Sequence, residues 1–137
     1  MKKIALFLCL LLFSCSPNQS KQVKQHDYCD VEAQISWSDI FLQCEDEYLV
    51  YFYRDTCGYC QTIKNEVIDY YLSKKEAMYF VDAETKDAKF GPIKDLTGIS
   101  DIESFYIFGT PFLIKTKEKK IVVYYAGMSQ ILEYIRA

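Results

Sequence analysis

The sequence predicts an α/β fold in which helices flank a central mixed β-sheet. Residues 48–53 are a continuous apolar run of strand-forming side chains, as expected for a strand covered on both faces. Apolar residues recur at helical spacing over residues 57–72, which predicts a helix directly after that strand. Two shorter apolar runs, 112–114 and 121–125, flank the charged segment 115–120 and indicate an antiparallel hairpin.

Length and composition agree with one domain. The chain has 137 residues, half of them hydrophobic, with 12 Tyr and 9 Phe, so it can fill one core but not a second. We expect this domain to span residues 28–137.

Shorter signals predict the elements at the start of the domain. Residues 28–35 fit a first strand, and Ser36 is a suitable N-cap for a helix over residues 37–44 that would bury Trp37. Residues 78–81 predict another short strand.

In the second half of the domain, glycines mark the boundaries of the predicted elements. Residues 90–97 predict a short helix closed by Gly98, and Gly127 ends the hairpin before Ser129 caps a final helix. The predicted order of elements is βαβαβαββα.

The first fifteen residues are typical of an export signal. Lys2 and Lys3 give a positive start, and the apolar run 4–13 is shorter than the roughly 20 residues of a membrane-spanning helix. Residues 1–15 are therefore predicted to be a signal peptide that is removed.

The end of this leader resembles a bacterial lipoprotein box, with Leu-Phe-Ser-Cys at residues 12–15. Cleavage there would leave Cys15 N-terminal and lipid-modified, which predicts an extracytoplasmic, membrane-anchored lipoprotein. The alternative is an ordinary secretory signal cleaved near Ser14 or Ser16, giving a soluble secreted or periplasmic protein. Residues 16–27 are polar and predict a flexible linker between the anchor and the domain.

The charge pattern excludes nucleic acid as an expected partner. Removal of Lys2 and Lys3 with the leader changes the formal net charge from −3 to −5, and basic residues cluster only at 115–120. The single histidine, His26, lies in the predicted linker and is assigned no role.

Cys57 and Cys60 form a Cys-x-x-Cys pair, a pattern found in redox sites and in metal sites. A structural zinc site needs four ligands, and after the leader only Cys29 and Cys44 remain to complete a set of thiolates. Because those two lie in a predicted strand and helix rather than in a metal-binding knuckle, we expect no metal and no other cofactor. The strand before the pair and the helix after it favour redox chemistry.

The two cysteines of the pair are predicted to have different roles. Cys57 starts the helix, where unpaired backbone N–H groups and the helix dipole lower a thiol pKa, so it is the expected nucleophile. Cys60 lies one turn further on, faces into the fold and is the expected resolving thiol. The intervening Gly58 and Tyr59 are predicted to tune the redox potential and to contact substrate.

These motifs resemble the thioredoxin superfamily. Residues 48–72 are similar to its active-site strand and helix, and residues 106–114 (Tyr-Ile-Phe-Gly-Thr-Pro-Phe-Leu-Ile) are similar to its cis-proline loop and following strand. The resemblance covers nearly all of residues 30–137 and implies a thioredoxin fold. It also implies that Pro111 is cis and packs against the cysteine pair, and that Thr110 offers backbone hydrogen bonds to an extended substrate.

Finer features of the motif also carry a resemblance. The Cys-Gly-Tyr-Cys sequence is similar to that of periplasmic disulfide isomerases, and residues 53–60 resemble small extracytoplasmic thioredoxin-like proteins, including the bacteriocin-transport accessory type. Thioredoxins place a buried acid six positions before the first cysteine, where this chain has Tyr51. Asp55 is nearer in sequence but is expected at a solvated turn. We therefore expect the resolving step to be slow or to rely on water.

Cys29 and Cys44 remain after the leader and the Cys-x-x-Cys pair are assigned. Outside the cytosol such a pair tends to be oxidised, and a bridge of this loop size stabilises a fold by about 3 kcal/mol. The alternative is two buried free thiols that act as small hydrophobes. The sequence leaves both open.

Two functions from different classes fit the sequence. The first is an extracytoplasmic thiol–disulfide oxidoreductase that acts on protein thiols and disulfides, exchanges electrons with a redox partner protein and is attached to the membrane by a lipid. The second is a non-catalytic binding or accessory module of an export system. Tyr51 favours the second function, and the intact cysteine pair favours the first.

Overall fold

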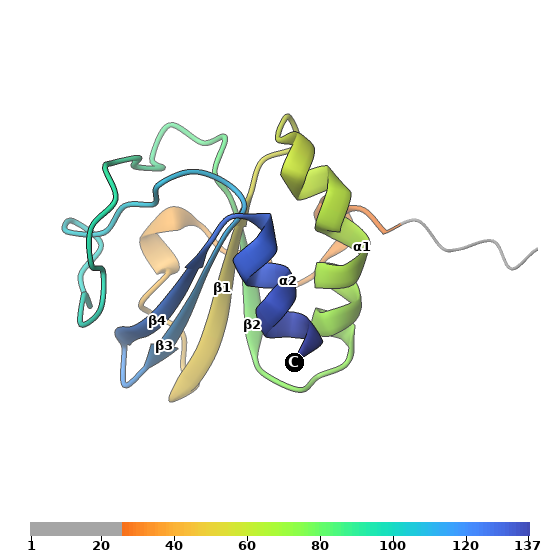
Figure 1. Ribbon diagram of the computed structural model, residues 1–137. Coiled ribbons are helices and arrows are strands. Elements are labelled where there is room, and N and C mark those ends of the chain that lie inside the picture. The colour runs from red at the N-terminus through yellow and green to blue at the C-terminus, as the bar shows by residue number, and fades with distance from the viewer. Residues whose placement is uncertain (1–25) are drawn as a thin grey trace, which may run out of the picture.

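The computed structural model describes residues 26–137, which form four strands and two helices (Figure 1). The strands are β1 (Glu47–Tyr53), β2 (Met78–Asp82), β3 (Phe112–Lys117) and β4 (Lys120–Ala126), and the helices are α1 (Gly58–Leu72) and α2 (Met128–Arg136). The predicted signal peptide, Cys15 and linker residues 16–25 lie outside the described residues. Within the described part, neither helix is long and apolar enough to cross a membrane.

The four strands form one mixed sheet in the order β2-β1-β3-β4. β1 and β2 run parallel, whereas β3 is antiparallel to both of its neighbours. Phe52 near the end of β1 pairs with Phe112 at the start of β3, so the chain that leaves β1 passes beside the chain that enters β3. The central mixed sheet predicted from the sequence is confirmed.

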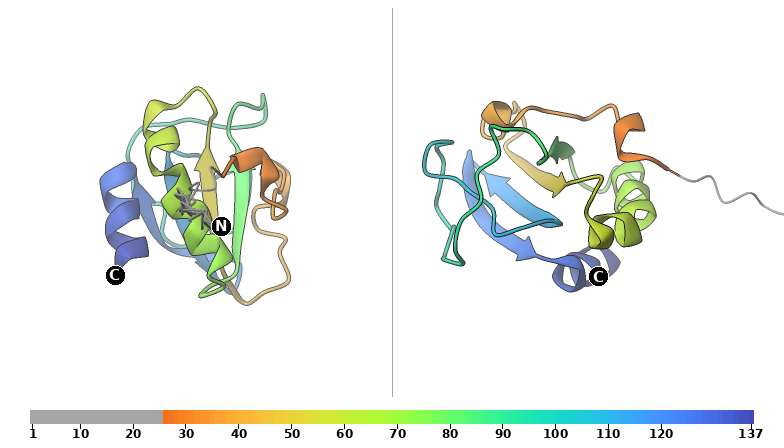
Figure 2. Two further views of the ribbon diagram at one scale, coloured as in Figure 1. Left: turned by 90° about the vertical axis from the view of Figure 1, so that its right-hand side faces the viewer. Right: turned by 90° about the horizontal axis from the view of Figure 1, so that it is seen from above.

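Both helices cover one face of the sheet, and irregular chain covers the other (Figure 2). The side chains of β1 alternate between the two faces of the sheet. Leu49, Tyr51 and Tyr53 pack against the helices, and Val50 and Phe52 pack against the irregular chain on the other face. This explains the continuous apolar run, since each face of the strand is buried.

The face away from the helices is closed by aromatic side chains. Trp37 is 5% exposed, stacks on Phe105 at 5.3 Å between ring centroids and contacts the ring of Phe52 edge-on. The prediction that Trp37 belongs to the core is confirmed.

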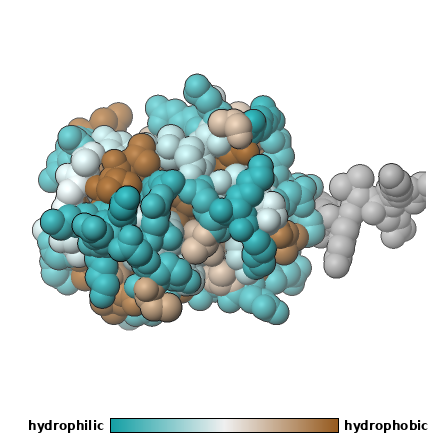
Figure 3. All heavy atoms as spheres, turned by 90° about the horizontal axis from the view of Figure 1, so that it is seen from below, coloured by the Kyte–Doolittle hydropathy of each residue, from teal (hydrophilic) through white to brown (hydrophobic). Residues whose placement is uncertain are grey.

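The opposite end of the molecule from the start of α1 is mostly hydrophilic, with its hydrophobic side chains divided into separate patches (Figure 3).

The predictions for the start of the domain were wrong. In place of a strand over residues 28–35 there is a short 3-10 helix, Tyr28–Asp30, followed by a single bridge between Gln34 and Phe80. The predicted helix over residues 37–44 is only one 3-10 turn, Trp37–Asp39. The Ser36 hydroxyl donates to the Asp39 carboxylate at 2.7 Å rather than capping a backbone N–H. This segment crosses the β2 edge of the sheet, so it cannot continue as one regular element (Figure 2).

Two further predictions were wrong. Residues 90–97 are irregular chain rather than a helix, since Phe90 bridges to Ile107 and the proline at position 92 disfavours helix before it. Ser129 does not cap the last helix, because α2 already begins at Met128. The turn before it needs Gly127, which has φ 86° and donates its N–H to Pro111 O at 3.0 Å. The observed order is therefore βαβββα.

Candidate functional site

The Cys57–Cys60 pair lies at the start of α1, just after the turn that follows β1. Cys57 is the N-cap residue of α1, in extended conformation, and Cys60 lies in the first turn. The turn is closed by a hydrogen bond from Cys57 N–H to Arg54 O at 3.1 Å. The strand register brings Thr110 and Pro111, which precede β3, to the same place.

The sulfur of Cys57 is held between the helix start and the loop before β3. It accepts a hydrogen bond from Cys60 N–H at 3.2 Å, and its thiol donates to Thr110 O at 3.3 Å. The Thr110–Pro111 peptide bond is cis. Cys57 is 7% exposed and Cys60 is completely buried, so only Cys57 can be approached from outside. The structure thus brings the Cys57–Cys60 pair and the Thr110–Pro111 dipeptide together.

The two thiols have opposite pKa shifts. Burial opposes ionisation of Cys57, but hydrogen bonds from Cys60 and contacts with Thr110 outweigh it, and the charge of Arg54 adds to them, so the Cys57 pKa lies below its ordinary value. Burial raises the pKa of Cys60 to about 12, and its hydrogen bond to Cys57 acts in the same direction. Cys57 is therefore the better nucleophile, as an N-terminal helix position predicts.

Arg54 is a component of the site that the sequence analysis missed. Its Nε donates to Thr110 Oγ1 at 3.0 Å, and its guanidinium lies 5.6 Å from the centroid of the Phe90 ring. It therefore joins the turn after β1 to the proline loop and places positive charge near Cys57. The sequence signal that could have identified Arg54 is a basic residue three positions before the first cysteine.

The other predicted substrate-contact residues border the pair. Tyr59 is 66% exposed, and no atom lies within 4 Å of where a Cβ of Gly58 would be. Beside them is a shallow cavity of about 180 Å³, lined by residues 108–112 together with Ala126 and Gly127. Tyr59 and the space around Gly58 are therefore accessible from outside.

A pair of tyrosines lies beneath Cys60. Tyr28 donates its hydroxyl hydrogen to Cys60 O at 2.5 Å, and the hydroxyls of Tyr28 and Tyr51 are 2.9 Å apart. Burial raises the pKa of both tyrosines far above the ordinary value, so neither can take up the proton of Cys60. Asp55 lies exposed in the turn, and none of the described carboxylates is hydrogen-bonded to Cys60.

Comparisons with known proteins identify the fold. Mitochondrial thioredoxin 3 from Saccharomyces cerevisiae, in its oxidized form, superposes with a TM-score of 0.50 at 12% identity, over 76% of this chain and 92% of that chain. The chain has the thioredoxin fold. A yeast chain from a study of thiol resolving in mitochondrial 1-Cys peroxiredoxin via glutathione/thioredoxin systems gives a TM-score of 0.52 at 11% identity, covering 81% and 98%. No family model and no curated protein matches the sequence.

In this thioredoxin fold Cys29 and Cys44 are not brought together. Both are exposed and unbridged, so neither of the two arrangements considered from the sequence is present. Cys29 lies near Asp55, beyond the carboxyl end of β1, whereas Cys44 precedes its amino end. At about 3.3 Å per residue the strand separates its two ends by roughly 20 Å, far more than a disulfide spans. Within residues 26–137 no three potential metal ligands cluster.

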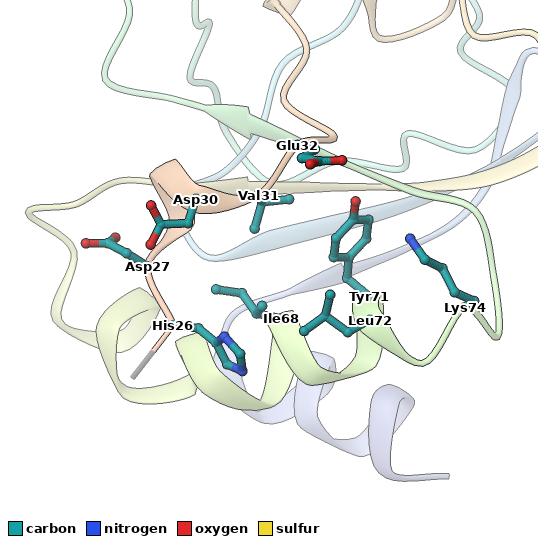
Figure 4. A pocket seen from close by; sticks show the side chains of 9 residues that line it. All are labelled: His26, Asp27, Asp30, Val31, Glu32, Ile68, Tyr71, Leu72 and Lys74. Atoms are coloured by element: carbon teal, nitrogen blue, oxygen red, sulfur yellow. The ribbon is translucent and has the colours of Figure 1, made fainter. Parts of the chain in front are cut away.

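A further cavity lies away from the cysteine pair. It has a volume of about 470 Å³ and lies between α1 and the N-terminal segment (Figure 4). Ile68 and Leu72 of α1 face Val31 across it, with the carboxylates of Asp27 and Asp30 at one end. Neither cysteine of the pair lines this cavity. Below it is called the seam between α1 and the N-terminal segment.

Proposed function

We propose that this protein is an extracytoplasmic thiol–disulfide oxidoreductase that acts on the thiols and disulfides of other proteins. The observation that carries the proposal is the state of Cys57. Its sulfur accepts Cys60 N–H at 3.2 Å, has a lowered pKa and is the outer member of a pair whose inner member is completely buried.

The geometry supports a two-step exchange. The Cys57 thiolate attacks one sulfur of a substrate disulfide, forming a mixed disulfide and releasing the other substrate sulfur as a thiolate. Cys60 then loses its proton and attacks Cys57 Sγ, which forms the Cys57–Cys60 disulfide and releases the second substrate thiol. Two electrons pass from the pair to the substrate, and the reverse sequence oxidises a substrate dithiol.

The second step has no built-in base. The tyrosine hydroxyls beneath Cys60 keep their protons, so the proton of Cys60 leaves to water or to the departing substrate thiolate. Resolution should therefore be slower than attack. This favours an enzyme that works on long-lived mixed disulfides over a fast general reductase.

The exposed groups around Cys57 fit a polypeptide substrate. Tyr59 offers an exposed aromatic ring, and Thr110 presents backbone opposite the Cys57 sulfur. Arg54 supports this loop through Thr110 Oγ1. A redox partner protein that recycles the pair would use the same surface.

The proposed location rests on the leader sequence. Residues 1–15, with Cys15 at their end, support export followed by lipid attachment, and the predicted linker 16–27 would hold the domain clear of the membrane. The small extracytoplasmic thioredoxin-like proteins, including the bacteriocin-transport accessory type, are the group that this combination resembles.

Trapping of substrates separates an enzyme from a binding module. In a Cys60→Ala variant, Cys57 can still form mixed disulfides but nothing internal resolves them, so reducible adducts with cellular proteins should accumulate on non-reducing gels. The matched control is Cys57→Ala, whose remaining thiol is buried and less ionised, and it should give few adducts. A folded, exported Cys60→Ala protein without adducts would favour the non-catalytic accessory module.

A further inference from the structure

We propose that Tyr28, a residue of the N-terminal segment outside both motifs, is a positioning residue for the resolving cysteine. Its hydroxyl fixes the backbone of Cys60 so that the Cys60 N–H and thiol point at the sulfur of Cys57. The inference rests on the proposed function, because it assigns a role in the same thiol exchange.

The direction of the hydrogen bonds follows from the chemistry of the acceptors. A carbonyl oxygen only accepts, so the single hydroxyl hydrogen of Tyr28 points to Cys60 O, 2.5 Å away. Tyr51 must then donate to Tyr28 across their 2.9 Å contact. The result is a chain of two hydrogen bonds, in which the Tyr51 hydroxyl donates to Tyr28 and the Tyr28 hydroxyl donates to Cys60 O. All three residues are fully buried, so water does not compete for these bonds.

Tyr28 is itself held in place by a closed set of contacts. Its ring stacks on Tyr53 with centroids 4.2 Å apart and an interplanar angle of 21°. The Tyr53 hydroxyl donates to Gln34 Oε1 at 3.0 Å, and Gln34 Nε2 donates back to Tyr28 O at 2.7 Å. With both its ring and its backbone fixed, the Tyr28 hydroxyl cannot turn away from Cys60.

The N-terminal segment is thereby fixed to the outer side of α1, where Figure 2 shows it beside the helix. Val31 faces Ile68 across the seam in Figure 4, and His26 contacts Asp69 at 3.0 Å. These contacts hold the segment that carries Tyr28 against α1.

Positioning matters because Cys60 supplies two of the groups that stabilise the Cys57 thiolate. Its N–H lies 3.2 Å from Cys57 Sγ, and its thiol also hydrogen-bonds there. Hydrogen bonds weaken steeply as their distance and angle depart from the optimum. A less constrained Cys60 would therefore stabilise the Cys57 thiolate less well, and fewer Cys57 thiols would be ionised at a given pH.

The test removes only the hydroxyl. In the full-length reduced protein, Tyr28→Phe should slow alkylation of Cys57 by iodoacetamide about threefold at a pH below the Cys57 pKa, the change that half a pKa unit produces. The matched control is Tyr48→Phe, which removes another buried tyrosine hydroxyl that donates to a backbone carbonyl, Ile40 O at 2.7 Å, on the other face of the sheet. The control should react at the wild-type rate.

Each outcome has one meaning. A wild-type alkylation rate in folded Tyr28→Phe, or equal slowing in Tyr48→Phe, overturns the positioning role. If Tyr28→Phe does not fold, Tyr51→Phe provides the test, because Tyr28 then loses the donor that orients its hydroxyl, and a wild-type rate overturns the proposal. Wild-type protein whose cysteine pair does not exchange with glutathione contradicts the proposed function instead, whatever the Tyr28 variant does.

Discussion

Cys57 and Cys60 are chemically identical side chains three residues apart, and the atoms around each sulfur make them different. Cys57 receives hydrogen bonds from the start of α1 and lies near the charge of Arg54. Cys60 is buried above two neutral tyrosines. This difference supports the proposed roles, in which Cys57 attacks and Cys60 resolves.

This difference predicts selective alkylation. At mildly acidic pH the lowered pKa of Cys57 gives it a larger thiolate fraction than Cys60, whose pKa of about 12 leaves almost none. Brief treatment of the reduced protein with iodoacetamide should label Cys57 well before Cys60, as read by peptide mass spectrometry. Preferential labelling of Cys60 would reverse the assigned roles.

The motif residues of the site could be predicted from sequence, but their neighbours could not. Cys57, Cys60, Thr110 and Pro111 belong to short patterns with fixed local geometry. Tyr28 contacts Cys60 from 32 positions earlier, and such a contact has no local signature. Long-range packing decides which of the 12 tyrosines lies under the pair.

At the scale of elements, a partly buried charge cluster joins both helices to the sheet. Glu76, between α1 and β2, accepts hydrogen bonds from Lys115 Nζ of β3 at 2.7 Å and from the Tyr134 hydroxyl of α2 at 2.5 Å. The Tyr70 hydroxyl of α1 donates to the same carboxylate. Burial opposes ionisation of Glu76, but these hydrogen bonds outweigh it and lower its pKa.

Glu76→Gln should destabilise the fold in a pH-dependent way. Because the folded-state pKa is lowered, the stabilisation is present above the unfolded value of about 4.3 and is lost as pH falls through the folded value. In urea denaturation at pH 7, the free energy of unfolding of the variant should be about 2 kcal/mol lower than that of the wild-type protein. The difference between the two proteins should narrow below about pH 4.

The exposed Glu133 on α2 provides the control for this experiment. Glu133→Gln should change the free energy of unfolding by no more than about 0.5 kcal/mol. If the two substitutions have equal effects, the cluster does not hold α2 to the sheet.

Elements with a strong periodic pattern could be predicted, whereas those shaped by distant contacts could not. β1 and α1 carry long regular signals, and their predicted bounds agree with the structure to within one residue. The segments 28–44 and 90–97 have apolar residues at plausible spacings but lie across an edge and a face of the sheet. There, packing against residues far along the chain overrides local propensity.

At the scale of the whole molecule, the domain presents its cysteine pair at one end, and the predicted linker would join the domain to the proposed lipid anchor. Cys15→Ala should release the protein from the membrane fraction, because it removes the thiol that would carry the lipid. Immunoblots of membrane and soluble fractions measure this. Cys44→Ala, which changes an exposed cysteine of the folded domain, should stay with the membrane. A Cys15→Ala protein that also stays there contradicts the lipoprotein proposal.

The central claim is that Cys57 and Cys60 form a reversible redox couple. The most direct measurement is its reduction potential, obtained by equilibrating the protein with glutathione buffers and quantifying the two oxidised cysteines by mass spectrometry. We predict one two-electron transition between about −270 and −120 mV, the range of thiol–disulfide oxidoreductases of this fold. A potential below about −300 mV, as in structural disulfides, or a pair that never equilibrates with the buffer, would contradict the account.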